Sequence, residues 1–260
     1  QQAAKRTAVW SDRVEASKIG AYDKGYVGHK AAKMMKRAKA VEARQKQAAE
    51  EKSLLLKNVE TAEELKVIPL EYHTDILAGF SEIAVYYGGK RVFDPVTFQV
   101  QRGDRIVLDG KNGSGKSSLL KLLTGQQIEY TGRLSVGSGL VISYVPQDTS
   151  YLTGTLSELA ERSHIDESLL KAVLRKMDFE RVQFEKDMAE FSEGQKKKAL
   201  IAKSLCERAH LYIWDEPLNF IDVYSRMQIE RLIQAFAPTM IFVEHDRAFQ
   251  EEIATKVITL

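Results

Sequence analysis

The segment Gly110–Ser117 has the residues needed to hold a phosphate group. It fits the pattern G-x-x-x-x-G-K-[ST] at each fixed position, follows the apolar run Arg105–Asp109 and opens a predicted helix. Glycines let backbone N–H groups curl around phosphate oxygens, and a helix N-terminus adds favourable partial charge. We expect Lys116 to reach the β- and γ-phosphates and the Ser117 hydroxyl to hold Mg²⁺. The predicted phosphate site comprises Gly110, Asn112, Gly113, Ser114, Gly115, Lys116, Ser117 and Ser118.

Two carboxylates follow a second apolar run. Leu211–Trp214 reads as a buried strand, and Asp215 and Glu216 come at its C-terminal end. Ligands of α/β sheets bind at that end of the strands. We expect Asp215 to assist Mg²⁺ through water and Glu216 to orient or deprotonate an attacking water. The plain alternative is a strand that simply ends in two acidic residues.

A third segment, Phe191–Gln195, precedes three lysines and an apolar helix. Ser192 is a good helix N-cap, so a capped helix is the plain structural interpretation. The segment also resembles the signature sequence of ABC ATPases, most often LSGGQ, with Phe191 for Leu and Glu193 for Gly. In that family the N-terminus of the signature helix caps the γ-phosphate held by a partner domain. The resemblance implies that Ser192, Gly194 and Gln195 act on a second ABC domain, and that ATP is hydrolysed only by the pair.

Four further segments resemble ABC elements in family order. Val145–Gln147 is similar to the Q-loop, with Gln147 sensing Mg²⁺ and the attacking water. Leu218–Asp222 resembles the D-loop, where Asp222 contacts the partner domain. Val243–Asp246 resembles the switch, with His245 on the γ-phosphate. Of the adjacent tyrosines that occupy the place of the adenine-stacking aromatic, strand alternation favours Tyr87 over Tyr86.

The elements that carry these motifs alternate between strands and helices. Such alternation predicts a mainly parallel sheet covered by helices. With the resemblance, the fold class is α/β: an ABC-type P-loop nucleotide-binding domain over residues 64–260, with a parallel-sheet core, an antiparallel β-subdomain and a helical subdomain at about 152–190. Predicted strands are 83–87, 96–100, 105–109, 141–145, 211–214, 240–243 and 256–260, and predicted helices begin at Lys116, Glu193 and Val223.

Residues 1–63 form a separate predicted unit. An imperfect a/d repeat of small and apolar residues over two segments predicts an α-helical hairpin, reversed at the glycine-containing stretch Ile19–Gly28. Residues 1–60 hold 14 Lys+Arg and 7 Asp+Glu, against 38 and 36 in the whole chain. A basic tip with neighbouring aromatics suits a nucleic acid, whereas a solvated helical face is the plain alternative.

Over essentially its whole length the chain resembles the C-terminal half of an ABC-F protein, in which two cassettes are joined by such a hairpin. Gly28–Arg37 and Glu216–Asp222 are similar to the antibiotic-resistance members of the Lsa and Vga type. The resemblance implies a ribosomal partner, with the tip at Ile19–Arg37 near 23S rRNA, P-site tRNA and the peptidyl-transferase centre. It further implies drug displacement as the function. The second ABC domain is then a missing N-terminal half or another copy of this chain.

Composition agrees with a cytoplasmic ATPase. The single cysteine, Cys206, suits a reducing compartment, the apolar runs are too short to span a membrane, and no export leader is evident. The implied cofactors are ATP and Mg²⁺. The alternative function is an ABC ATPase subunit of a transporter or of a DNA-repair complex. A transporter subunit needs membrane partners, and repair ATPases carry long coiled coils between the phosphate loop and the signature.

Overall fold

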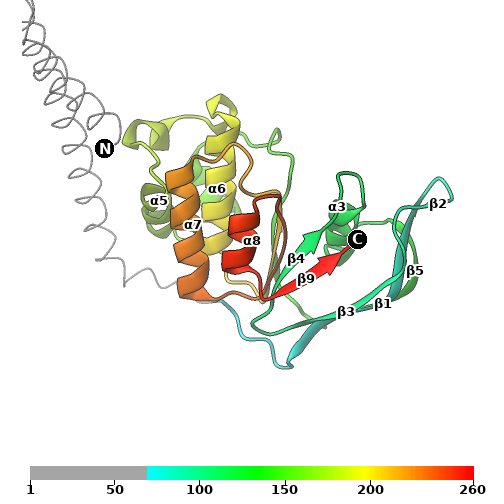
Figure 1. The fold of residues 1–260 in the computed structure, drawn as a ribbon. Coiled ribbons are helices and arrows are strands. Elements are labelled where there is room, and N and C mark those ends of the chain that lie inside the picture. Colours follow the sequence, from blue (N-terminus) through cyan, green and yellow to red (C-terminus); the bar gives the residue numbers. More distant parts are fainter. Residues whose placement is uncertain (1–68) are drawn as a thin grey trace, which may run out of the picture. The chain divides into compact units, whose positions relative to one another are not determined.

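The computed structural model describes residues 69–260 (Figure 1). The predicted hairpin at residues 1–63, its tip at Ile19–Arg37 and the domain boundary beside it lie outside the described residues. Those three points therefore stay predictions. The domain described below is residues 69–260.

A five-stranded parallel sheet forms the centre of this domain. Its strands are β4 (Arg105–Asp109), β6 (Ile142–Val145), β7 (Leu211–Asp215), β8 (Met240–Val243) and β9 (Lys256–Thr259). The order is β6-β7-β8-β4-β9, and every neighbouring pair is parallel. β7 and β8 are buried along their whole length because both faces of the sheet are covered. All five strands were predicted from their apolar runs.

A second, antiparallel sheet packs against the parallel sheet and the helix Lys116–Leu123 through a shared cluster of apolar side chains. Its strands are β1 (Ile76–Tyr87), β2 (Lys90–Arg91), β3 (Val96–Gln101) and β5 (Glu129–Val136). β1 pairs with the other three. The predicted strand at 83–87 was too short, because the register shifts after Ser81 interrupt the alternation in β1. β5 was not predicted, since nearly all its residues are exposed and give no apolar pattern.

The stretch predicted to be helical at about 152–190 contains helices joined by short loops and no strand. They are α4 (Leu156–Arg162), α5 (Glu167–Lys176) and the short 3₁₀ helices η1 (Arg181–Glu185) and η2 (Met188–Glu190). Thr155 and Glu158 form a capping box at the start of α4, and Asp166 caps α5. These caps explain why polar residues bound each helix.

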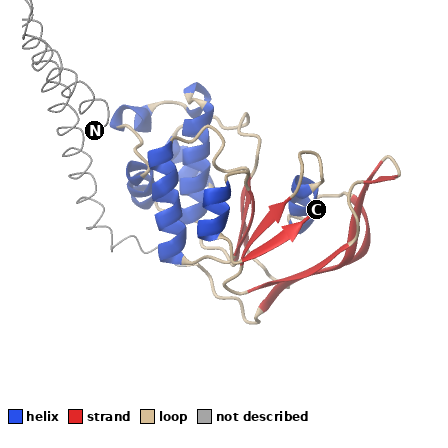
Figure 2. Cartoon of the chain, viewed as in Figure 1, coloured by secondary structure: helices blue, strands red, loops and turns tan. Residues whose placement is uncertain are grey.

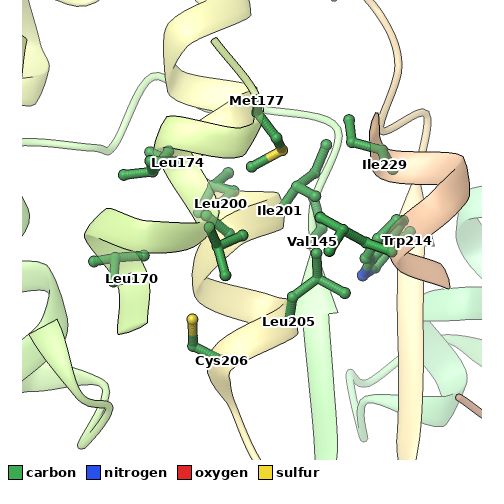
Figure 3. Close-up of a cluster of buried hydrophobic side chains, with 14 of the residues drawn as sticks. Val145, Leu170, Leu174, Met177, Leu200, Ile201, Leu205, Cys206, Trp214 and Ile229 are labelled. Atoms are coloured by element: carbon green, nitrogen blue, oxygen red, sulfur yellow. The ribbon is translucent and has the colours of Figure 1, made fainter. Parts of the chain in front are cut away.

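The remaining helices flank the parallel sheet. They are α3 (Lys116–Leu123), α6 (Glu193–Cys206), α7 (Val223–Phe236) and α8 (Arg247–Ile253). Figure 2 shows the larger helices gathered on one side of the sheet. Figure 3 shows the cluster there, in which Trp214 of β7 lies beside Ile229 of α7, and the side chains of α6 separate it from Leu170 and Leu174 of α5. A second cluster fills the other face, between the parallel sheet, α3 and the antiparallel sheet. Close packing of apolar side chains on both faces makes the sheet rigid, and the ends of its strands are therefore held in place.

Candidate functional site

An open cleft of about 810 Å³ lies at the C-terminal ends of the parallel strands. The loops after β4, β6, β7 and β8 all contribute to it, as expected for a ligand site in an α/β sheet. The cleft is lined by Tyr87, Val92, Asn112, Gly113, Gly115, Lys116, Ser117, Ser118, Gln147, Glu216, Asn219 and His245. The structure therefore brings together predicted residues that are far apart in the sequence.

The loop after β4 is built to receive an anion. Lys116 is only 6% exposed, and its Nζ donates to the carbonyl oxygens of Gly110 at 2.8 Å and Lys111 at 3.0 Å. The hydroxyl of Ser114 is buried and has no hydrogen-bond partner within the described domain. A buried unpaired hydroxyl is unfavourable, and a phosphate oxygen would satisfy it. The residues present therefore fit a bound phosphate.

Gly115 is the residue that permits this loop to turn into α3. Its φ is +94°, and a Cβ there would lie 2.7 Å from the Phe93 ring and 2.9 Å from Val92. A residue with a side chain does not fit this position unless Val92 and Phe93 move. Gly115 also provides no side-chain cap to α3. The first-turn N–H groups of α3 thus lack a side-chain acceptor and suit a phosphate.

Ser117 and Asp215 place two side-chain oxygens, both possible metal ligands, beside the loop. The Ser117 hydroxyl donates to Asp215 Oδ1 at 3.1 Å. Burial raises the pKa of Asp215, with the charge of Glu216 adding to the effect and the Ser117 hydrogen bond opposing it. Mg²⁺ prefers such hard oxygen ligands, and it takes one or two from protein and the rest from phosphates and water. The pair therefore fits Mg²⁺. Gln147 is the third predicted Mg²⁺ ligand, and its side chain donates a hydrogen bond to Glu216 in this structure.

Two side-chain amides from two loops hold the carboxylate of Glu216, and a histidine from a third loop lies nearby. Oε2 accepts hydrogen bonds from Gln147 Nε2 at 2.8 Å and from Asn219 Nδ2 at 2.7 Å, while His245 Nε2 lies 3.6 Å from Oε1. The backbone of Glu216 has a φ of +49°, and its N–H donates to the Val243 carbonyl at 3.0 Å. A left-handed conformation at a residue other than glycine is often found at functional sites. Glu216, Gln147 and His245 were predicted to act together, and the structure places them together.

Asn219 and Glu244 are parts of this arrangement that the sequence did not reveal. Asn219 lines the cleft and contacts Glu216 directly. Glu244 is only 4% exposed, and its carboxylate accepts from the backbone N–H groups of Leu218 at 3.1 Å and His245 at 2.8 Å. It therefore links the loop after β7 to the loop after β8. An acidic residue at the end of a fully buried strand was the available signal for Glu244.

The start of α6 is a capped helix as well as the candidate signature. The Ser192 hydroxyl accepts from Gln195 N at 3.3 Å, and the Gln195 side chain accepts from Ser192 N at 2.9 Å. This reciprocal pair is a capping box. A Cβ on Gly194 would lie 2.4 Å from the Phe220 carbonyl oxygen, so glycine permits this close approach. Asp222 forms an ion pair with Lys198, with 2.8 Å between Oδ2 and Nζ.

The predicted residues of the domain thus fall into three groups, one that lines the cleft and two that do not. Ser192, Gly194, Gln195 and Asp222 do not line the cleft that holds Lys116 and Glu216. Gly110, Ser114 and Asp215 lie behind the lining residues, where they shape the loop and the metal pair.

Tyr87 is at the other end of the cleft. It is 54% exposed at the end of β1, and its hydroxyl lies 3.0 Å from the Ser118 hydroxyl. An exposed ring beside a phosphate loop can stack on a nucleobase. The position of Tyr87 agrees with the predicted adenine contact, which stays a prediction.

Known proteins similar to this chain are ATP-binding proteins. The model of the ABC transporter family matches residues 93–219. Putative ATP-binding protein YdiF of Bacillus subtilis (strain 168) is 34% identical over 169 residues, which is 64% of this chain and 26% of that protein. ABC transporter F family member 2 of Arabidopsis thaliana is 29% identical over 178 residues, 66% of this chain and 26% of that protein. The chain thus spans about a quarter of the length of these relatives.

The solved structures give the same fold. An ATP binding subunit of an ABC transporter superposes with a TM-score of 0.61 at 25% sequence identity, over 71% of this chain and 85% of that one. Within residues 69–260, none of the helices has the length and apolar character needed to cross a bilayer.

Proposed function

We propose that this chain, which contains an ABC-type ATPase domain, binds MgATP in the cleft and hydrolyses it through Glu216 in an ABC-F protein that acts on the ribosome. The observation that carries the catalytic part is the Glu216 carboxylate, which Gln147 and Asn219 hold at the edge of the cleft beside His245. Lys116 and the loop after β4 lie in the same cleft. A phosphate-binding loop and an oriented carboxylate are the two parts that hydrolysis of a phosphoanhydride needs.

Each side chain has a defined task in this proposal. Lys116, Ser114 and the N–H groups of α3 bind the phosphates, and Tyr87 stacks on adenine. Ser117 and Asp215 hold Mg²⁺, which when bound neutralises phosphate charge. Glu216 accepts a hydrogen bond or a proton from the attacking water, Gln147 fixes the orientation of that carboxylate, and His245 contacts the terminal phosphate.

Hydrolysis requires a second ABC domain in this proposal. The cleft is open, and the signature residues Ser192, Gly194 and Gln195 do not line it. Those residues would instead close the cleft of a paired domain, while its signature would close this one. Asp222 would lie at the same interface. The second domain is either an N-terminal half of the same protein or another copy of this chain.

The ribosomal part of the proposal rests on sequence. The basic segment 1–63 resembles the hairpin that joins the two cassettes of ABC-F proteins, and relatives include members of the F family. The tip at Ile19–Arg37 would bind 23S rRNA and P-site tRNA through phosphate contacts. The likeness of Gly28–Arg37 to Lsa- and Vga-type proteins supports antibiotic resistance by drug displacement in the cytoplasm.

A transporter subunit is the second candidate, because transporter ATPases have the same fold. It differs in needing membrane-embedded partners and in having no use for a basic hairpin before the cassette. The two candidates therefore predict different partners for the same ATP-bound form.

Co-sedimentation with bacterial ribosomes tests the proposal. The intact protein carrying Glu216→Gln should pellet with ribosomes when ATP is present, because ATP binds but is not hydrolysed. The matched double variant Glu216→Gln/Lys116→Ala should not pellet, since it lacks the phosphate contact. A Glu216→Gln protein that also lacks residues 19–36 should stay in the supernatant. Pelleting that does not depend on ATP, or no pelleting at all, would reject the ribosomal function.

A further inference from the structure

Lys197 is the middle residue of three consecutive lysines in α6, and it is the buried one. A run of charges on a helix is usually a solvated face. Lys196 pairs with Glu193 at 3.3 Å and Lys198 pairs with Asp222 at 2.8 Å, both near the start of α6. Lys197 instead is only 2% exposed and points into the domain.

The ammonium group of Lys197 lies between two catalytic loops. Its Nζ donates to the carbonyl oxygen of Pro146 at 2.9 Å and lies 3.4 Å from that of Asp215. These carbonyls belong to the residues immediately before Gln147 and Glu216. The side chains of Gln147 and Glu216 are themselves hydrogen bonded at 2.8 Å. One buried ammonium thus holds the two peptide groups from which this side-chain pair projects.

Burial of this charge is unfavourable by itself. Burial lowers the pKa of Lys197, and the carboxylates of Asp215, Glu216, Glu244 and Glu193 oppose that effect. An apolar side chain of similar volume generally serves stability as well as a buried ion pair does or better. Lys197 donates to main-chain carbonyls at the catalytic end of the sheet. A role in positioning therefore explains the residue better than a contribution to folding.

We propose that Lys197 is a positioning residue for ATP hydrolysis. Its ammonium fixes the peptide groups before Gln147 and Glu216, and so sets the hydrogen bond that orients the Glu216 carboxylate. Because Lys197 is one turn from Gly194, it also ties the start of α6 to that pair. Docking of α6 against a second ABC domain is thereby linked to the geometry of this chain's own catalytic carboxylate. The inference rests on the proposed role of Glu216.

The test is steady-state ATP hydrolysis by the intact protein carrying Lys197→Met. A paired ABC domain can also hydrolyse ATP. The difference in ATPase activity between the wild type and Glu216→Gln therefore gives the turnover that belongs to this chain's site. We expect Lys197→Met to lower kcat for that part at least about tenfold, because misplacement of a catalytic group by an ångström is enough for such a loss. KM and the affinity for a fluorescent ATP analogue should stay within about threefold, since the phosphate contacts are unchanged.

Lys203→Met is the matched control on the same helix. Lys203 pairs with Glu207 near the end of α6 and does not line the cleft, so its replacement should leave kcat unchanged. Lys197→Gln keeps an amide donor without the charge, and it should recover part of the kcat that Lys197→Met loses. This second variant also carries the test if Lys197→Met does not fold.

The outcomes separate the two proposals. Wild-type turnover that Glu216→Gln leaves intact overturns the proposed catalytic role, and the positioning role falls with it. Loss in Glu216→Gln together with normal kcat in Lys197→Met overturns the positioning role alone. If Lys197→Met and Lys197→Gln lose ATP affinity and thermal stability in parallel with kcat, Lys197 has only a structural role and the inference is wrong.

Discussion

The side-chain amide of Asn219 donates a 2.7 Å hydrogen bond to Oε2 of Glu216, the same oxygen that accepts from Gln147. Two neutral donors on one oxygen restrict rotation of the carboxylate. The other oxygen faces His245. The carboxylate proposed to act in catalysis is therefore restrained by contacts on both of its oxygens, and such preorganisation limits the reorganisation that a reaction requires.

Removal of the Asn219 amide should slow the chemical step. Asn219→Ala removes one of the two amide donors that restrain the Glu216 carboxylate, so we expect kcat to fall roughly tenfold with little change in KM. Steady-state ATPase assays of the intact protein measure both constants. Gln127→Ala, at an exposed site outside the cleft, is the control. Unchanged kcat in Asn219→Ala would show that the hydrogen bond has no part in catalysis.

A side chain at Gly194 should force α6 and the loop after β7 apart. The Cβ of alanine would lie 2.4 Å from the Phe220 carbonyl oxygen, which is backbone and cannot rotate away. Alanine is favoured over glycine in helices by about 1 kcal/mol, so helix propensity alone predicts a gain in stability. We expect the overlap to outweigh that gain. Urea denaturation of Gly194→Ala should give a lower midpoint than wild type, and a higher midpoint would contradict the close approach.

The ion pair of Asp222 should make stability depend on pH in the acid range. Although burial opposes it, hydrogen bonds from Lys198 and Ser225 lower the pKa of Asp222 from its ordinary value of 3.8 to about 2. The folded state thus holds this carboxylate charged more tightly than the unfolded state does. Its contribution is fully present above the ordinary value and is lost as the pH falls toward about 2.

Asp222→Asn tests this contribution. Asparagine is also a good N-cap, so the start of α7 should be preserved while the ion pair with Lys198 is lost. Denaturant unfolding at about pH 6 and about pH 3 should show a smaller loss of unfolding free energy on acidification than in wild type. Equal acid sensitivity of the two proteins would show that Asp222 does not contribute.

The sequence predicted those parts of the molecule that depend on local patterns. The five parallel strands were predicted from short apolar or β-branched runs, which in β7 and β8 reflect burial on both faces, and the phosphate loop because its glycines and Lys116 stand at fixed spacing. β5 was missed because its exposed residues leave no alternation, and α8 because it is short. Asn219, Glu244 and Lys197 were missed for a different reason. Their roles depend on contacts between loops that only the folded sheet brings together.

Local and functional interpretations also proved compatible at the start of α6. Ser192 caps the helix, as the plain interpretation predicted, and the Gln195 side chain completes a capping box that was not predicted. The same residues, with Gly194, have the order of an ABC signature. A capping pattern in the sequence therefore could not decide between them, because one segment satisfies both.

The catalytic role of Glu216 is tested by ATP hydrolysis and ATP binding of the intact Glu216→Gln protein. The substitution keeps the shape of the side chain and removes its charge. We expect turnover at this site to fall by about 10² or more, as for loss of a catalytic base, while ATP affinity stays near that of wild type. Normal turnover in Glu216→Gln would contradict the assignment of Glu216 and with it the proposed mechanism.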